Sequence, residues 1–322
     1  MRICIFGAGA VGSHFAVRLA LAGHDVSCVM RGAHLEAAKA KGLTLRVGDA
    51  EFSAHVKASD DPAALGPQDV VISTLKANGL SSLATGLSPL LRDDTAVVFA
   101  QNGIPWWYDI GLPADQPPPD LAFLDPGGLL RVAVSPQRIV GGVIFSSNEI
   151  VAPGIVVNDS PERNMLLVGE CDDRASERIQ RLRSALDGAL IQSPQVSRIR
   201  EAIWTKLITN MSVSVLCMLT AKTARAAVED PALQDVVSRM LEEAHSIARS
   251  CYGGVTRRSG AAPSHRPSLL QDYEHGRPME IDALVRAPQA FARAAGLSTP
   301  TLDVLAALAI QKARDKGLYL QV

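Results

Sequence analysis

The chain has 322 residues, a length that favours two domains. Apolar residues make up 47% of the chain and charged residues 20%, so it has enough apolar side chains to bury a sizeable core. Lys and Arg (32) nearly balance Asp and Glu (33), for a net charge of -1. This balance argues against electrostatic binding of nucleic acid, which needs a basic surface.

The sequence predicts neither a membrane span nor a metal site. No stretch approaches about 18 uninterrupted apolar residues. The five cysteines are scattered, odd in number and without metal-ligand spacing, which favours buried thiols in a reducing compartment. Glycines interrupt the apolar N-terminus, unlike a signal peptide. We therefore expect a cytoplasmic protein.

Short apolar runs alternate with helical patterns in the first half of the chain. This order predicts βαβ units, and hence a parallel sheet with helices on its faces. The predicted strands are Arg2–Phe6, Asp25–Met30, Val70–Leu75, Ala96–Ala100 and Val140–Phe145, and the first two predicted helices are Val11–Ala22 and His34–Lys41.

A proline-rich excursion, Ile104–Gln137, interrupts this alternation. Irregular segments of this length are usually either functional or disordered. Because it starts with Trp106, Trp107 and Tyr108, we expect its base to be ordered and packed.

Long helical patterns fill the remainder, namely Arg198–Thr220, Pro231–Ser250, Asp282–Gly296 and Pro300–Lys316. We therefore predict an α/β fold with an N-terminal Rossmann-type parallel-sheet domain (1–196), followed by an all-α C-terminal domain (197–322).

The motif Gly7-Ala8-Gly9-Ala10-Val11-Gly12 fits G-x-G-x-x-G between a predicted strand and a predicted helix. In dinucleotide sites these glycines allow a tight turn, close approach of the pyrophosphate and close helix–strand packing. The helix N-terminus then binds the pyrophosphate. The alternative is a glycine-rich turn without a ligand.

The end of the second predicted strand bears on the choice of cofactor. NAD sites usually place an acidic residue there, to bind the ribose 2′-hydroxyl. This chain has Arg31 and no acid. A guanidinium suits a 2′-phosphate, so NADP(H) is favoured, although surface arginines are common.

Two polar residues follow later strands. Lys76 comes after Val70–Leu75, and Asn102 comes after Ala96–Ala100. Ligands of open α/β sheets bind at the carboxyl ends of strands. Lys76 is thus a candidate for the cofactor phosphates and Asn102 for the nicotinamide ribose or the substrate. The alternative for both is a solvated loop residue.

The helix pattern over Glu201–Thr220 is apolar on nearly all sides, yet it carries Lys206. Lys206, Asn210 and Ser214 follow one another at intervals of four, which on an α-helix makes one polar stripe. Desolvation lowers a lysine pKa, which suits proton transfer near neutral pH. The alternative is a lysine that extends from a core helix to solvent.

A third polar cluster lies within Ser268–Asp282, around a Gly276-Arg277-Pro278 turn. Glu280 follows this turn. Its carboxylate either stabilises the positive N-terminal end of the next helix, or pairs with a site lysine or binds a ribose hydroxyl.

Together these features resemble the ketopantoate reductase (2-dehydropantoate 2-reductase) family over nearly the whole chain. The ordered combination is more specific than the glycine motif alone. The matching pieces are Gly7–Gly12, Arg31, Lys76, Gln101-Asn102-Gly103, Pro153-Gly154, Trp204-x-Lys206-x-x-x-Asn210, Ser268-x-x-Gln271-Asp272, Gly276-Arg277-Pro278-x-Glu280-Ile281-Asp282 and Thr299-Pro300.

The resemblance implies NADPH-dependent reduction of a 2-oxo acid to a 2-hydroxy acid in the cytoplasm, on the pantothenate pathway. It implies that Lys206 is the general acid, that Asn210 binds the substrate and that Ser268 helps to hold its carboxylate end. A second substrate-binding asparagine is usual in the family where this chain has Ser214.

The resemblance also implies a catalytic role for Glu280, which would contact the cofactor ribose and order the site. Lys76 and Asn102 would contact NADPH, and Asn102 would also reach the substrate. The excursion after Gly103 is longer than in compact members. Together with Ser214, it leaves open which 2-oxo acid is used.

Two other functions remain open from the sequence. One is an NADP-dependent dehydrogenase of a different oxo acid on the same scaffold, and the other is a non-catalytic NADPH-binding sensor. A homodimer through the helical domain is compatible with the apolar character of Arg198–Thr220.

Overall fold

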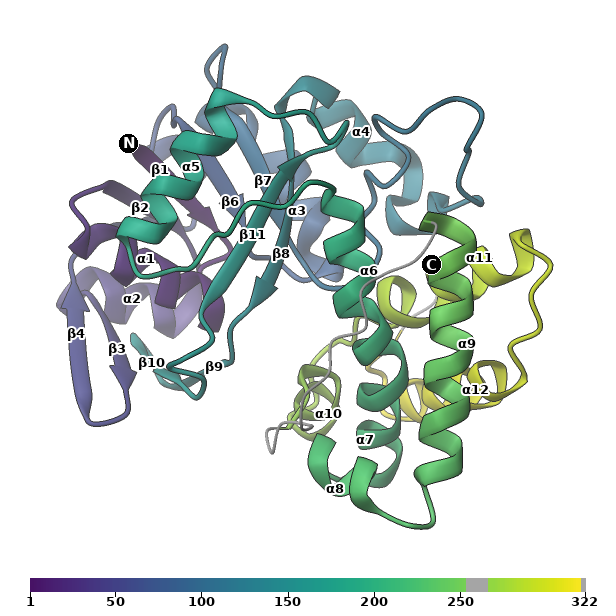
Figure 1. Cartoon of the computed structure of the whole chain (residues 1–322). Helices are drawn as coiled ribbons and strands as arrows, with labels where there is room; N and C mark the ends of the chain where they lie inside the picture. Colours follow the sequence, from purple (N-terminus) through teal and green to yellow (C-terminus); the bar gives the residue numbers. More distant parts are fainter. Residues whose placement is uncertain (253–265, 320–322) are drawn as a thin grey trace. The chain divides into compact units, whose positions relative to one another are not determined.

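The computed structural model describes residues 1–252 and 266–319 (Figure 1). The chain forms two compact units. Unit 1 contains Met1–Gln101 and Gly128–Ile199, and unit 2 contains Asn102–Gly127 and Arg200–Val322. The predicted α/β fold with a helical C-terminal part is confirmed. The sequence predicts one boundary near residue 196, whereas 102–127 belongs to the same compact unit as the C-terminal helices.

A seven-stranded sheet forms the centre of unit 1. Its strands are β1 (Arg2–Phe6), β2 (Asp25–Val29), β5 (Lys57–Ser59), β6 (Val70–Ser73), β7 (Ala96–Ala100), β8 (Ile139–Phe145) and β11 (Met165–Glu170). The order is β11-β8-β7-β6-β1-β2-β5, and only β11 is antiparallel to its neighbour. The strand order changes direction between β1 and β6, where Rossmann-type sheets bind their ligands.

Helices pack around this sheet, and its central strands are accordingly continuous apolar runs. Every residue of β6, β7 and β8 is buried. The helices of unit 1 are α1 (Ala10–Leu21), α2 (Gly32–Lys41), α3 (Leu80–Gly86), α4 (Leu129–Ala133) and α5 (Glu177–Gly188). Short 3₁₀ turns of unit 1 are η1 (Pro62–Ala64), η2 (Ala77–Gly79), η3 (Ser88–Leu90) and η6 (Pro136–Arg138). In unit 2 lies η4 (Ala122–Leu124), and η5 (Pro126–Gly128) spans the change from unit 2 to unit 1.

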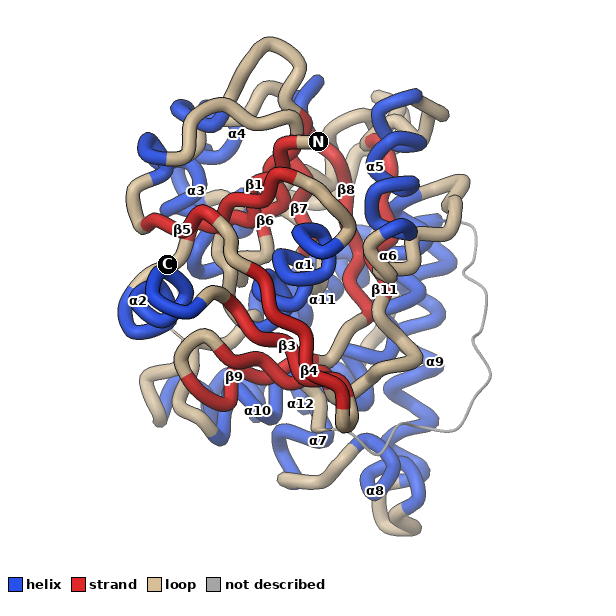
Figure 2. The backbone as a smooth tube through the Cα atoms, turned by 90° about the vertical axis from the view of Figure 1, so that its left-hand side faces the viewer, coloured by secondary structure: helices blue, strands red, loops and turns tan. Residues whose placement is uncertain are grey.

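A second sheet in unit 1 has no counterpart in the sequence-based prediction. It has the order β4-β3-β10-β9, formed by β3 (Leu43–Val47), β4 (Ala50–Ala54), β9 (Asn148–Ala152) and β10 (Ile155–Asn158). All four strands contact α1, which also packs on β1 and β2 (Figure 2). Because α1 lies between two sheets, Phe15 and Leu19 on one side of the helix and Val17 on the other are all fully buried.

The contact between α1 and the second sheet contains a buried histidine. His14 is fully buried, and its Nδ1 lies 2.8 Å from Asn148 Oδ1. The Asn158 amide donates to the Asn148 and Asn164 side-chain oxygens, so the histidine belongs to an amide network. Burial lowers the pKa of His14 to about 4 against the partly compensating bond to Asn148, so the ring is neutral at pH 7.

This histidine predicts a loss of stability in mild acid. Because the unfolded chain protonates His14 near its ordinary pKa of 6.5 and the folded chain only near 4, stability falls as the pH drops through this window. Between pH 7 and pH 5 the expected loss in the free energy of unfolding is about 2 kcal/mol. Urea denaturation at both pH values measures it. His14→Gln should remove this part of the slope and His55→Gln should keep it; equal slopes in all three proteins contradict the assignment.

One long helical segment forms the centre of unit 2. It runs through α6 (Ile199–Thr209), the π-helical turn η7 (Asn210–Ser214) and α7 (Val215–Thr220). Around it lie α8 (Ala224–Glu229), α9 (Gln234–Tyr252), α10 (Ser268–Glu274), a second π-helical turn η8 (Asp282–Arg286), α11 (Ala287–Ala294) and α12 (Pro300–Asp315). This surrounding explains why the central segment is apolar on nearly all sides.

By length and composition, Ile199–Thr220 also meets the criteria for a membrane span, with a mean hydropathy of 1.4. However, 67% of its apolar window is buried inside the protein. Core helices of soluble proteins share these properties, so the segment is weak evidence for a membrane.

Candidate functional site

The glycine motif forms a tight turn between β1 and α1. Gly7 has φ +88°, and a Cβ built there would lie 2.4 Å from Leu75 Cδ2. A Cβ on Gly12 would lie 2.5 Å from Thr74 Oγ1 and 2.9 Å from Ile5 Cγ2. The first glycine thus permits the turn, and the third lets α1 pack closely on the sheet, as the motif predicts.

Gly9 differs, because the protein leaves space beside it. A Cβ built on Gly9 would approach only Gly7 O, at 3.8 Å. The first backbone bond of α1 runs from Ser13 N to Gly9 O, so the N–H groups of residues 10–12 are not used within the helix. Space at the second glycine and N–H groups at a helix start fit the pyrophosphate of a dinucleotide.

A threonine that the sequence analysis did not single out supports this turn. Thr74 Oγ1 donates to Gly7 O at 2.8 Å, and Thr74 N donates to Phe6 O at 3.0 Å. Thr74 directly follows β6, at the same sheet edge as the glycine turn. The strand predicted as Val70–Leu75 ends at Ser73 in the structure, so the sequence placed Thr74 within the strand and gave no signal for this role.

Arg31 and Lys76 also follow strands at this edge. Arg31 is exposed and precedes α2, two residues after β2 ends. Val29 O, at the end of β2, accepts hydrogen bonds from Gly7 N and Ala8 N. Lys76 is half-buried and precedes η2, three residues after β6. Unit 1 therefore brings the glycine motif, Arg31 and Lys76 to the carboxyl edge of its sheet.

In unit 2, Lys206 is hydrogen-bonded to Asn102. Lys206 Nζ donates to Asn102 Oδ1 at 2.7 Å, between residues that are 104 positions apart in the chain. The lysine lies on α6 and is half-buried rather than fully enclosed. The structure thus joins two residues that the sequence analysis selected on separate grounds, and the amide oxygen fixes the direction of the ammonium group.

The polar stripe below Lys206 differs from the expected α-helical one. Asn210 begins the π-helical turn η7 and Ser214 ends it. A π turn is wider than an α turn, so the spacing of four no longer stacks these two side chains as in an α-helix. Asn210 is half-buried, whereas Ser214 is 6% exposed. Isolated π turns are frequent at functional sites.

The other predicted residues of unit 2 lie on segments that touch this helix. Glu280 is 7% exposed and precedes η8, which contacts η7. Ser268 is exposed at the first position of α10, which also contacts η7. Thus α10, which carries Ser268, and η8, which Glu280 precedes, both contact the turn that carries Asn210 and Ser214.

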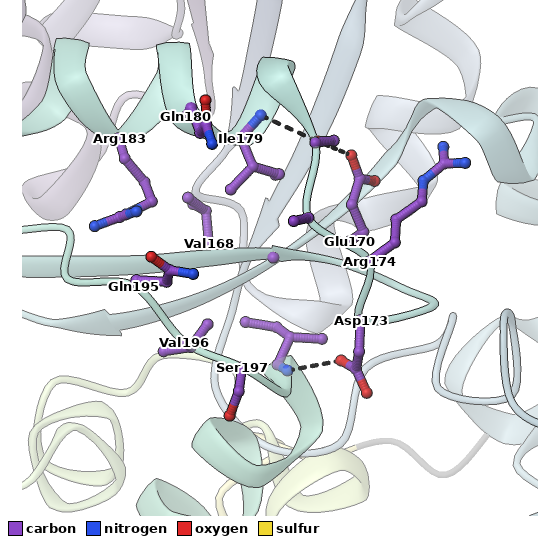
Figure 3. A pocket seen from close by; sticks show the side chains of 14 residues that line it. Val168, Glu170, Asp173, Arg174, Ile179, Gln180, Arg183, Gln195, Val196 and Ser197 are labelled. Carbon is purple, nitrogen blue, oxygen red and sulfur yellow. Dashed lines mark hydrogen bonds between the residues drawn. The ribbon is translucent and has the colours of Figure 1, made fainter.

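None of the predicted site residues lines the cavity drawn in Figure 3. Its volume is about 90 Å³, and Glu170, Arg174, Gln180, Arg183 and Gln195 are among the residues that line it. Glu170 pairs with Val140 near the start of β8, so the cavity lies at the amino edge of the parallel strands, opposite the glycine turn. It is therefore separate from the candidate cofactor site.

Within residues 1–252 and 266–319, no group of three or more His, Cys, Asp and Glu side chains is arranged to hold a metal ion. The candidate chemistry rests on a lysine, amides, hydroxyls and a carboxylate.

Comparisons with known proteins agree with this geometry. Residues 3–107 match the family profile "Ketopantoate reductase PanE/ApbA", and residues 198–313 match its C-terminal counterpart. The first match contains the glycine motif, Arg31, Lys76 and Asn102. The second contains Lys206, Asn210, Ser214, Ser268 and Glu280.

Whole-chain relatives give the same assignment. A 2-dehydropantoate 2-reductase of Mesorhizobium japonicum is 41% identical, covering 99% of this chain and 100% of that protein. A crystal structure of a candidate ketopantoate reductase from Ralstonia solanacearum has a TM-score of 0.88 at 35% identity, with 99% of both chains covered. D-mandelate dehydrogenase with NADH and anilino(oxo)acetate has a TM-score of 0.82 at 19% identity, covering 99% and 100%, and shows the shared fold alone. This chain belongs to the ketopantoate reductase family.

Proposed function

We propose that this protein is an NADPH-dependent oxidoreductase that reduces a 2-oxo acid, 2-dehydropantoate or a related compound, to the 2-hydroxy acid. Family membership and the relatives named 2-dehydropantoate 2-reductase support the reaction class. The observation that carries the chemistry is the Lys206–Asn102 hydrogen bond of 2.7 Å, which holds a proton donor in one direction.

Unit 1 supplies the cofactor site in this proposal. The N–H groups at the start of α1 bind the pyrophosphate, and the space at Gly9 admits it. Arg31 binds the 2′-phosphate and Lys76 also contacts NADPH, while Asn102, a residue of unit 2, adds a further cofactor contact. When bound, the reduced nicotinamide supplies the hydride that the carbonyl carbon of the substrate receives.

Unit 2 supplies the groups that act on the substrate. Lys206 donates a hydrogen bond to the carbonyl oxygen, stabilises the negative charge that develops there and then transfers its proton to that oxygen. Asn102 orients the ammonium group and contacts the substrate. Asn210, Ser214 and Ser268 bind the polar groups of the substrate, and Glu280 orders the site and contacts the cofactor ribose.

The substrate is tested by following NADPH oxidation with a panel of 2-oxo acids that includes 2-dehydropantoate. A clear preference for 2-dehydropantoate supports the narrow assignment. A preference for another member of the panel identifies a different oxo acid on the same scaffold, in keeping with the serine at position 214. Tight NADPH binding without turnover of any member would contradict an enzymatic role.

Arg31 is expected to decide between NADPH and NADH. A charge-assisted hydrogen bond contributes about 1.5–3 kcal/mol, so Arg31→Ala should raise KM for NADPH about 10- to 100-fold and leave KM for NADH unchanged. Steady-state kinetics with both cofactors measure this. Arg46→Ala, which removes an exposed arginine paired with Glu51 in the second sheet, is the matched control. An equal loss with both cofactors would argue against a 2′-phosphate contact.

We also propose a cytoplasmic location and a homodimer through the helical unit. The five cysteines are free thiols without metal-ligand spacing, and all except Cys251 are buried. This is compatible with a reducing compartment. Sedimentation of the purified protein at several concentrations tests the oligomeric state.

A further inference from the structure

The segment that carries Asn102 is fastened to the lysine-bearing helix by a buried arginine. Arg200 lies at the start of α6 and is 1% exposed. Its Nε and Nη2 donate to Tyr108 O at 2.9 and 2.8 Å, and Nη2 also donates to Ile110 O at 2.6 Å. The guanidinium carbon lies 5.5 Å from the centroid of the Trp107 ring. Such a planar fork binds two carbonyls in a fixed orientation, which a lysine cannot reproduce.

One helical turn further along α6, a second contact joins the same pieces. Trp204 Nε1 donates to Tyr108 OH at 2.7 Å, and both side chains are buried. The Phe291 ring of α11 packs edge-on against Tyr108 and Trp204, with centroid distances of 5.1 and 5.2 Å. Arg200, Trp204 and Lys206 thus lie on one helix. Arg200 and Trp204 bind the segment 102–108, and Asn102 at the start of that segment binds Lys206.

The other end of this segment is held by η8. Ile104 N donates to Ala283 O at 2.9 Å. Gly103 has φ +78°, and a Cβ there would lie 2.5 Å from Ala283 O, so only glycine permits this approach. The residues directly after Asn102 are therefore held by η8, and Tyr108, six residues after Asn102, is held by α6.

From this arrangement we propose that Arg200, Tyr108 and Trp204 are positioning residues, which act through residues 102–108 to hold Asn102 Oδ1 against Lys206 Nζ. The proposal rests on the role of Lys206 as proton donor. A displacement of about 1 Å at a reacting group can cost up to about 10²-fold in rate, so this clamp should affect turnover although its three residues are not among the proposed contacts to substrate or cofactor.

Three variants test the clamp. Tyr108→Phe and Trp204→Phe each remove the same hydrogen bond and keep an aromatic ring, and Arg200→Lys keeps the charge but not the fork. We expect kcat to fall about 5- to 10-fold in the first two and about 10- to 100-fold in Arg200→Lys, with Kd for NADPH unchanged. The solvent deuterium isotope effect on kcat should rise, because proton transfer becomes slower. Because Trp204→Phe also leaves a cavity where the larger indole was packed, the double variant Tyr108→Phe/Trp204→Phe should be no slower than Trp204→Phe alone.

The control is Thr95→Val, which removes a buried hydroxyl that donates to Gln68 O and so lowers stability within unit 1. Its kcat and isotope effect should match the wild type.

Crystal structures of Tyr108→Phe and Arg200→Lys supply a readout that needs no turnover: the 2.7 Å contact between Asn102 and Lys206 should lengthen or break. If Arg200→Lys does not fold, Tyr108→Phe, which loses one atom, decides the matter.

The outcomes separate this proposal from the proposed function. Wild-type kcat and an unchanged Asn102–Lys206 contact in the clamp variants would overturn the positioning role, even if Lys206→Ala is inactive. A wild-type protein that reduces no 2-oxo acid would overturn the proposed function, and the crystallographic distances would still decide whether the clamp holds Asn102.

Discussion

Lys206→Ala is expected to lower kcat by about 10³-fold, within the range that general acid catalysis contributes. The variant loses both the ammonium group that stabilises charge on the carbonyl oxygen and the proton that this oxygen must receive. NADPH binding should change little, because the proposed phosphate contacts are made by residues of unit 1. Single-turnover oxidation of NADPH, with Kd from cofactor fluorescence, separates the two effects.

The matched control for this variant is Lys222→Ala in the same unit. Lys222 forms an ion pair with Asp230 at 3.0 Å that is partly open to solvent, so its removal should cost little stability and no activity. Near-normal turnover by Lys206→Ala would exclude this lysine as the acid. A loss of both turnover and NADPH binding would instead indicate a role in holding the cofactor.

Gly9→Ala should abolish efficient cofactor binding while leaving the fold intact. The added Cβ meets no protein atom closer than 3.8 Å and φ is −79°, so the apo protein should keep its fold. The ψ of −148° lies outside the usual β region, so alanine should lower its stability only slightly. In the complex, however, the methyl group would occupy the space proposed for the pyrophosphate. Loss of one charge-assisted hydrogen bond to phosphate costs about 1.5–3 kcal/mol, so Kd for NADPH should rise about 10- to 100-fold.

Gly12→Ala provides the opposite pattern. Its Cβ would lie 2.5 Å from Thr74 Oγ1 and 2.9 Å from Ile5 Cγ2, so either α1 or these side chains must shift. Overpacking of this kind costs about 1–3 kcal/mol of stability. Thermal unfolding of both variants, with and without NADPH, measures the contrast. If Gly9→Ala binds NADPH as tightly as the wild type, the turn is not the pyrophosphate site.

The sequence predicted the central sheet well because its signals are local. Ala96–Ala100 is a strand with the predicted bounds, since five consecutive apolar residues end at a polar Gln-Asn-Gly sequence. The glycine motif was interpretable for the same reason: the strand before it and the helix after it are adjacent in the chain.

The second sheet escaped prediction because the pairing that joins its two hairpins, β3–β4 and β9–β10, is not local. β3 pairs with β10, more than 100 residues later in the chain, and β3 is a short run in which only Leu43 and Leu45 are fully buried. Short alternating runs are ambiguous until a partner covers them. The second sheet also covers one side of α1, so the burial of this helix on two sides could not be predicted either.

In the candidate site, residue types were predictable and their exact arrangement was not. A period of 3.6 residues stacks Lys206, Asn210 and Ser214, but the π turn over 210–214 changes this stacking, and no sequence pattern distinguishes such a turn. The bond between Lys206 and Asn102 likewise depends on the fold that brings distant segments together. Arg200 offered one signal, a charged residue within a helix that is otherwise largely buried.

The role of Lys206 as proton donor is tested most directly by a crystal structure with NADP⁺ and a poorly reactive 2-oxo acid analogue bound. We expect Lys206 Nζ to lie within about 3 Å of the oxygen that corresponds to the substrate carbonyl, with Asn102 still in contact with the ammonium group. A different side chain on that oxygen, with the Lys206 ammonium turned to solvent, would contradict it.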